Sequence, residues 1–206
     1  MLAIIATAAL AACHGRPAEQ VRDSVKTAVE PRAIAFVDVT VVPLDAPREL
    51  PHTTVVVRGD RIVAIGPTAT TVLPEGAERI DGKGKYLMPG LADMHVHITR
   101  EADLALFVAR GVTTVRNMWG APMHLALRDR VRRGELLGPT ITTAGPILDG
   151  DPPVHPGSFV VRSAADAVEA IRLHQTMGYD FVKVYSRLGE PALEAITRAS
   201  KGAGLV

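Results

Sequence analysis

The chain has 206 residues, with 23 Lys and Arg against 22 Asp and Glu, and 47% of its residues are hydrophobic. These values fit an ordinary globular protein of one or two domains. The balanced charge shows none of the basic excess typical of nucleic-acid-binding proteins, so we expect no nucleic-acid partner. Cys13 is the only cysteine of the sequence, which excludes an intramolecular disulfide.

The first feature along the chain is an apolar segment at residues 2–12. Its 11 residues are too few for a bilayer-spanning helix, which needs about 20, but they suit the core of an export signal peptide. The sequence Leu10-Ala11-Ala12-Cys13 resembles the bacterial lipobox, in which cleavage before the cysteine leaves its thiol to be lipidated. The alternative is an ordinary signal peptide that happens to contain a cysteine.

We therefore expect a signal peptide over residues 1–12, lipidation at Cys13 and a polar tether over residues 13–32. His14 rather than Asp follows the cysteine, which in signals of this kind indicates the outer membrane. The expected location is the bacterial cell envelope. The protein would be exported and held by its N-terminal lipid in the outer membrane, facing the periplasm.

Residues 33–86 show short apolar segments separated by Pro and Gly, a pattern that predicts strands and turns. Gly59-Asp60 is the expected turn between two apolar-rich strands. The expected strands span residues 34–43, 53–57, 61–65 and 79–81.

Residues 87–98 form an apolar run that ends in His95 and His97, after a turn at Pro89-Gly90. The continuous apolar character predicts a strand covered on both faces. Residues i and i+2 of a strand project from the same face, so the two imidazoles would lie side by side. Imidazole is a ligand suited to zinc and its neighbours, and the pair therefore predicts half of a metal site. Two unrelated surface histidines are the alternative.

After Gly90 the pattern changes to strands alternating with helices, several of which are followed by a glycine. Ser163 and Asp166 form an expected capping pair at the start of one helix. The alternation predicts an α/β fold with four parallel strands. The expected helices span residues 101–110, 123–133, 163–177 and 190–201, and the strands that follow the first span 112–116, 140–144 and 181–185.

The stretch at residues 87–98 closely resembles the first barrel strand of the amidohydrolase superfamily of metal-dependent hydrolases, nearest to its imidazolonepropionase-like and prolidase-like branch. Residues 55–67 resemble the hairpin of that family. Residues 111–118 and 178–185 resemble its second and fourth barrel strands. Several motifs in family order make the resemblance specific, and it runs from about Ala33 to the end of the chain.

The resemblance implies the first half of a (β/α)8 TIM-like barrel, about four β/α units over residues 87–206, preceded by part of a small β-sandwich domain over residues 33–86. A complete barrel takes about 250 residues, whereas residues 91–206 supply 116. We therefore expect a truncated N-terminal half without the family's later histidines and its catalytic aspartate. We identify no catalytic residue in this half and expect it to be inactive alone.

The resemblance also implies a role for Lys183. In many family members the lysine at this position is carbamylated and bridges two metals, whereas a protonated lysine is a cation and cannot bind a metal. The alternative is a lysine at a strand end that reaches into solvent. We expect His95, His97 and Lys183 to hold one or two divalent ions, and zinc is the metal we expect.

Substrate contacts in such barrels lie at the carboxyl ends of the strands. A small molecule or a dipeptide is the expected substrate, and each candidate contact could instead be a loop or core residue. The candidates are Arg116, Asn117, Trp119, His155 and Tyr185. The other histidines outside the tether, His52, His124 and His174, fall on a loop or on helices, and we expect them at the surface.

The expected reaction is hydrolysis of a carbon–nitrogen bond in an amide, cyclic amide or dipeptide by a metal-activated water. Two alternatives remain open. One is a mononuclear enzyme resembling imidazolonepropionase or a deaminase, and the other is a non-catalytic truncated surface lipoprotein. Nothing in the sequence predicts the oligomeric state.

Overall fold

The computed structural model describes residues 31–205, which divide into two compact units. The first unit runs up to Val39 and from Pro51 to Lys85, and the second comprises Thr40–Leu50 and the chain from Tyr86 onward. The predicted signal peptide, Cys13 and nearly all of the predicted tether lie outside the described residues. No helix within residues 31–205 is long and apolar enough to cross a membrane.

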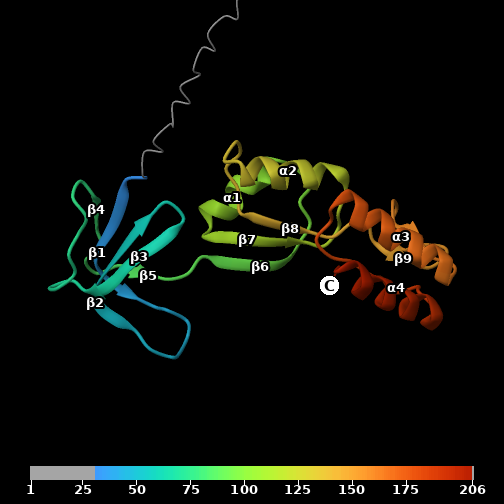
Figure 1. Cartoon of the computed structure of the whole chain (residues 1–206), viewed down its shortest axis with the longest axis horizontal. Coiled ribbons are helices and arrows are strands. Elements are labelled where there is room, and N and C mark those ends of the chain that lie inside the picture. The colour runs from blue at the N-terminus through green and yellow to red at the C-terminus, as the bar shows by residue number, and fades with distance from the viewer. Residues whose placement is uncertain (1–30, 206) are drawn as a thin grey trace, which may run out of the picture. The chain divides into compact units, whose positions relative to one another are not determined.

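The first unit is built on a β-sheet (Figure 1). Its strands β2 and β3 are antiparallel and meet at the predicted Gly59-Asp60 turn. Gly59 has a φ of +59° there, a conformation that residues with a side chain rarely adopt. The last two residues of β1, Thr40 and Val41, belong to the second unit and pair in parallel with the short β5 (Tyr86–Leu87) of that unit. The strand order is β3-β2-β1-β4, with β1 at Ala33–Val41, β2 at Leu50–Arg58, β3 at Arg61–Pro67 and β4 at Glu78–Asp81.

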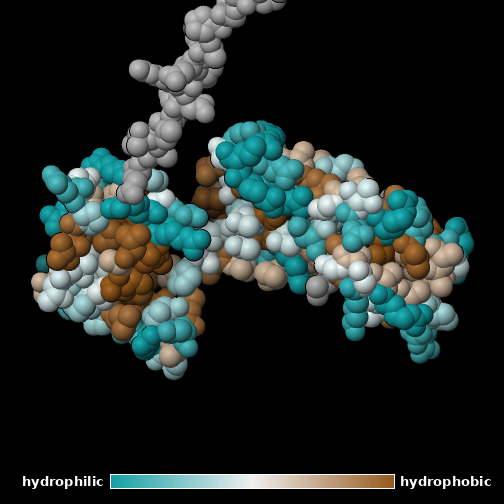
Figure 2. All heavy atoms as spheres, viewed as in Figure 1, coloured by the Kyte–Doolittle hydropathy of each residue, from teal (hydrophilic) through white to brown (hydrophobic). Residues whose placement is uncertain are grey.

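The surface of the first unit carries a hydrophobic area over its strands (Figure 2). Its small buried core consists of Ala33, Ala35 and Val56. The large hydrophobic side chains of the unit that stay exposed are Ile62, Val63, Ile65, Val72 and Ile80.

The second unit begins with a parallel three-stranded sheet in the order β6-β7-β8. Helices α1 (Asp103–Ala109) and α2 (Pro122–Arg132) lie on one side of this sheet (Figure 1). Parallel strands joined by helices confirm the predicted α/β class. The strands are β6 (Leu91–Val96), β7 (Val112–Asn117) and β8 (Thr140–Thr143), and the buried cluster beneath the helices is Val96, Ile98, Leu104, Val115, Leu127 and Ile141.

Strand β6 is less buried than the sequence predicted. The apolar run predicted cover on both faces, but Leu91 and Met94 are about half exposed. Within the described residues β6 pairs with β7 alone, so it is an edge strand, and helices cover only one face of its sheet. The expectation of full burial is wrong for this strand.

The remainder of the second unit packs helix α3 against helix α4. At the start of α3, Ser163 Oγ accepts a hydrogen bond from Asp166 N at 3.2 Å and Asp166 Oδ2 accepts one from Ser163 N at 2.9 Å, which confirms the predicted capping pair. Gly178 ends this helix with a φ of +81°. The elements are β9 (Leu148–Asp149), β10 (Phe159–Val160), α3 (Ala164–Met177) and α4 (Glu190–Ala203).

The fourth predicted strand, at residues 181–185, is present only as two isolated parallel bridges, Ala144 to Phe181 and Leu148 to Val184. Between these bridges the neighbouring segment contains Pro146, which has no N–H to donate to a ladder. Leu148 N still donates to Lys183 O at 2.9 Å. The segment therefore lies beside its neighbour without forming a continuous strand.

Candidate functional site

Five aromatic side chains form a continuous row at the carboxyl ends of the parallel strands and the segments that follow them. His95 is the last but one residue of β6, and its ring centroid lies 5.5 Å from that of His97. The His97 ring is 5.7 Å from Trp119, which follows β7. Trp119 is 5.2 Å from His155, and His155 is 4.7 Å from Tyr185. We call these five residues the aromatic row.

Lys183 lies at the end of the aromatic row. Its Nζ is 5.9 Å from the ring centroid of Tyr185, which is within the range of a cation–π contact. The structure thus brings together six of the residues singled out in the sequence, from segments nearly 90 positions apart. The roles assigned to them stay predictions.

The surroundings of His97 favour the neutral form of its ring. Its pKa is lowered, first by partial removal of the ring from water and then by the positive charges of His95, Lys183 and His155. A lowered pKa keeps the imidazole neutral at neutral pH. The neutral imidazole is the form that binds a metal.

The donor set fits part of a metal centre. His95 and His97 supply two neighbouring imidazoles, the ligand type that zinc prefers together with thiolates and carboxylates. A catalytic zinc usually has three protein ligands. Among residues 31–205, no group of three or more His, Cys, Asp or Glu side chains is placed to hold a metal ion. The pair therefore fits as two ligands of a larger set.

Arg116 and Asn117 lie next to the aromatic row but are engaged by the protein itself. Arg116 Nε donates to Met94 O at 2.9 Å, and its guanidinium lies 5.7 Å from the centroid of the Phe181 ring. The Asn117 side chain is fully buried and bonded on both its oxygen and its nitrogen. Their predicted contacts with a substrate stay predictions.

Two histidines expected at the surface are buried instead. His124 is 4% exposed and His174 is 2% exposed. The His124 ring is bonded on both nitrogens, whereas burial without a bonded partner lowers the pKa of His174 to about 4. In the structure His124 is the third residue of α2, and its ring accepts a hydrogen bond from the N-cap amide of Ala121. His52 is exposed, as expected, and bonds Asp38 at 2.9 Å.

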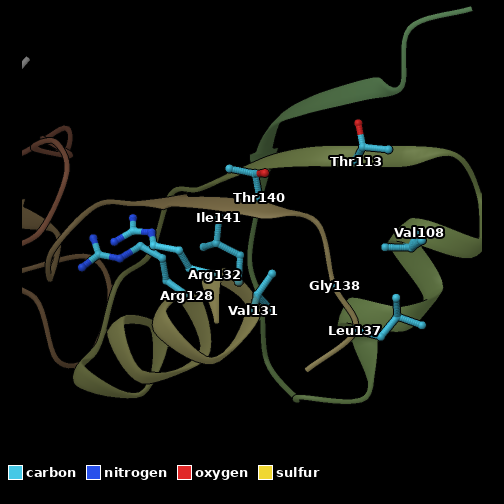
Figure 3. A pocket seen from close by; sticks show the side chains of 9 residues that line it. All are labelled: Val108, Thr113, Arg128, Val131, Arg132, Leu137, Gly138, Thr140 and Ile141. Atoms are coloured by element: carbon cyan, nitrogen blue, oxygen red, sulfur yellow. The ribbon is translucent and has the colours of Figure 1, made fainter. Parts of the chain in front are cut away.

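Two cavities of the second unit lie at opposite ends of the strands. One of about 270 Å³ borders His97 and Trp119. The other, of about 470 Å³, lies where β7 and β8 begin, with Thr113 and Thr140 in its wall (Figure 3). The smaller cavity lies at the carboxyl ends of the strands beside the aromatic row, so it is the one at the candidate site.

The sequence matches no family model. It is 34% identical over 82 residues to an adenine deaminase of Rubrobacter xylanophilus, a match that spans 40% of this chain and 14% of that protein. It is 40% identical over 55 residues to an imidazolonepropionase of the same organism, which spans 25% of this chain and 13% of that protein. The matched segments are thus a small part of these curated relatives.

A solved structure extends the similarity to most of the chain. A Bifidobacterium longum protein assigned as a prolidase superposes with a TM-score of 0.76 and 26% identity, over 86% of this chain and 49% of that one. In sequence and in fold the chain is similar to proteins of the amidohydrolase superfamily. This similarity agrees with the resemblance recognised in the sequence. The chain spans about half of the matched structure.

Proposed function

We propose that the protein hydrolyses a carbon–nitrogen bond of a small molecule or a dipeptide with a metal-activated water. The observation that carries this proposal is the convergence of His95, His97 and Lys183 with the aromatic row at the carboxyl ends of the strands. The similar proteins are named as a deaminase, an imidazolonepropionase and a prolidase, which supports this class of reaction.

His95 and His97 would hold one divalent ion, which we propose to be zinc. Such an ion supplies a water of lowered pKa and a Lewis acid for the scissile carbonyl. Lys183 would serve as a second anchor only after its amine has reacted with carbon dioxide, because its ammonium form has no lone pair to donate. The carbamate would bear the negative charge that a second ion requires.

Trp119, His155 and Tyr185 would form the wall against which the substrate lies. Their rings follow one another at 5.2 and 4.7 Å, so a flat or apolar group of the substrate can lie along them. The cavity beside His97 and Trp119 would accept a further part of the substrate. Small amides or dipeptides that carry a flat or apolar group are therefore the substrates that we propose.

The metal content of the purified full-length protein tests the site. Two equivalents of zinc per chain are expected, and Lys183→Ala should lower that number because it removes the bridging group. Lys201→Ala is the matched control, since Lys201 is an exposed lysine in the last turn of α4 and lies outside the aromatic row. Equal metal content in the two variants would contradict the bridging role of Lys183.

The adenine deaminase match favours a second candidate, a mononuclear deaminase-like enzyme. In that case one equivalent of metal is expected, and Lys183→Ala should leave it unchanged. Assays with Xaa-Pro dipeptides and with adenine separate the two candidates. A protein that binds no metal and hydrolyses neither substrate would instead be a non-catalytic surface lipoprotein.

We also propose that the protein is exported and lipid-anchored through Cys13 in the outer membrane. The support is the lipobox-like sequence at residues 10–13. Cys13→Ala should move the protein from the membrane fraction to the soluble fraction of cells that express the full-length chain. An unchanged membrane fraction would contradict lipid anchoring.

A further inference from the structure

The backbone directly after His97 is held on both sides by side chains from other elements. Ile98 N donates to Asn117 Oδ1 at 3.1 Å, and His124 Nε2 lies 2.8 Å from Ile98 O. Asn117 lies at the end of β7 and His124 on α2, and all three residues are buried. The peptide groups that flank Ile98 are thus fixed through both the N–H and the C=O.

The second bond of the His124 ring identifies its tautomer. Ala121 N donates to His124 Nδ1 at 2.8 Å, so Nδ1 is the acceptor and carries no proton. The proton of the neutral ring is therefore on Nε2, which donates it to Ile98 O. One histidine thereby joins the start of α2 to the residue after His97.

Further hydrogen bonds connect Asn117 to the segment that carries Lys183. Asn117 Nδ2 donates to Thr143 Oγ1 at 3.0 Å, at the end of β8. Thr143 N donates to Asp180 Oδ2 at 2.8 Å. Asp180, three positions before Lys183, also accepts from Arg128 Nη1 at 2.9 Å. Arg128 and His124 both lie on α2, so this helix closes the hydrogen bonds into a ring. We call this ring the clamp network, and its members are Ile98, Asn117, Thr143, Asp180, Arg128 and His124.

We propose that Asn117 and His124 are positioning residues, which fix the orientation of His97 and its spacing from Lys183. This inference rests on the proposed function, since it takes His97 as a metal ligand. His97 cannot change its backbone direction without breaking hydrogen bonds of buried groups, and each such group left unsatisfied is costly. Partners that orient a metal ligand in this way govern the affinity of the site.

Hydrogen exchange of the Ile98 amide tests the clamp without any metal. In the full-length protein, Asn117→Ala removes the acceptor of that amide and should speed its exchange by about tenfold or more. Exchange at the amide of Ile171, buried on α3, should change much less. An unchanged exchange rate at Ile98, or an equal acceleration at both amides, would overturn the proposal.

Zinc affinity tests the consequence for the site. His124→Leu should weaken zinc binding by about tenfold. His124→Gln should restore most of the affinity, because its amide offers an acceptor for Ala121 N and a donor for Ile98 O. His174→Leu is the matched control, since His174 is equally buried and its ring nitrogens have no bonded partner in the described structure.

The positioning role would be overturned if His124→Leu and His174→Leu weakened zinc binding equally. It would also be overturned if His124→Gln did not restore zinc affinity. Either result would mean that the loss of affinity comes from disturbed packing. A wild-type protein that binds no zinc would overturn the proposed function. The Ile98 exchange experiment would still decide whether the clamp exists, so the two failures are distinguishable.

Discussion

Asp149 holds the loop that carries His155. Its buried carboxylate accepts hydrogen bonds from three backbone amides, two of the loop that begins at Gly150 and one of Arg187. Burial by itself raises the pKa of this carboxyl, but the three N–H donors and the charge of Arg187 outweigh burial, and the net pKa is lowered. The ionised form is therefore the one that the folded protein stabilises.

Replacement of this carboxylate should alter stability in a pH-dependent way. Because the folded pKa lies below the ordinary value of 3.8, the stabilisation by Asp149 is fully present above that value and is lost as pH falls through the folded pKa. Asp149→Asn should lower the free energy of unfolding at pH 7 by about 2 kcal/mol, because an amide N–H2 then faces a backbone N–H.

Urea unfolding between pH 7 and pH 3 measures this effect. The stability difference between the wild type and the Asp149→Asn variant should narrow as pH falls below 3.8, because protonation of the carboxyl then removes the ionised form that the folded protein stabilises. A constant difference over the whole range would contradict the role of the ionised carboxylate. Asp60→Asn is the control, because Asp60 is exposed in the hairpin turn.

At the scale of single residues, the sequence predicted which side chains come together better than it predicted the buried residues around them. His95, His97 and Lys183 were recognisable because strand periodicity and family position are local properties. His124 and His174 were placed at the surface because a histidine on a helix is polar. Their burial depends on contacts from elsewhere in the chain, such as the bond between His124 and Ile98, 26 positions away.

Helix α3 shows how local signals define an element. Ser163 satisfies an N–H of the first turn, and Gly178 ends the helix in a left-handed conformation. The sequence predicted this helix over residues 163–177, and the structure has it at Ala164–Met177. The segment at residues 181–185 was predicted less well. A strand forms only by pairing with a neighbouring segment, and here the neighbouring segment contains Pro146, which interrupts the pairing.

The cap of α3 should contribute measurably to stability. Ser163→Ala removes the acceptor of Asp166 N and should lower the free energy of unfolding by about 1 kcal/mol. Thermal or urea unfolding measures the change. Ser186→Ala is the control, because Ser186 is exposed and lies outside a helix; equal effects of the two substitutions would contradict a capping role.

At the scale of the whole molecule, the sequence predicted the α/β class and the alternation of strands and helices from β6 to β8. The apolar run at residues 87–98 predicted cover on both faces of its strand, whereas Met94 on β6 is 48% exposed. Exposure depends on which segments assemble on each face of a sheet. That information is not local to the apolar run itself.

The exposed edge of β6 should promote self-association of the 206-residue chain expressed alone. Met94→Lys places a charge on that edge and should shift the chain toward monomer in sedimentation experiments. Met123→Lys is the matched control, because Met123 is 46% exposed but lies on α2, where the backbone N–H and C=O groups bond within the helix. Equal effects of the two variants would show that net charge, rather than the strand edge, controls association.

The clamp network also bears on the order of folding. Its hydrogen bonds join residues 19, 26, 37 and 52 positions apart in the chain. Closing loops of these lengths lowers the conformational entropy of the chain before any stabilising contact has formed. The ring can therefore form only once β6, β7 and β8 lie side by side. Weakening one of its members should therefore speed unfolding more than it slows folding, and the site would be among the last parts of the molecule to form.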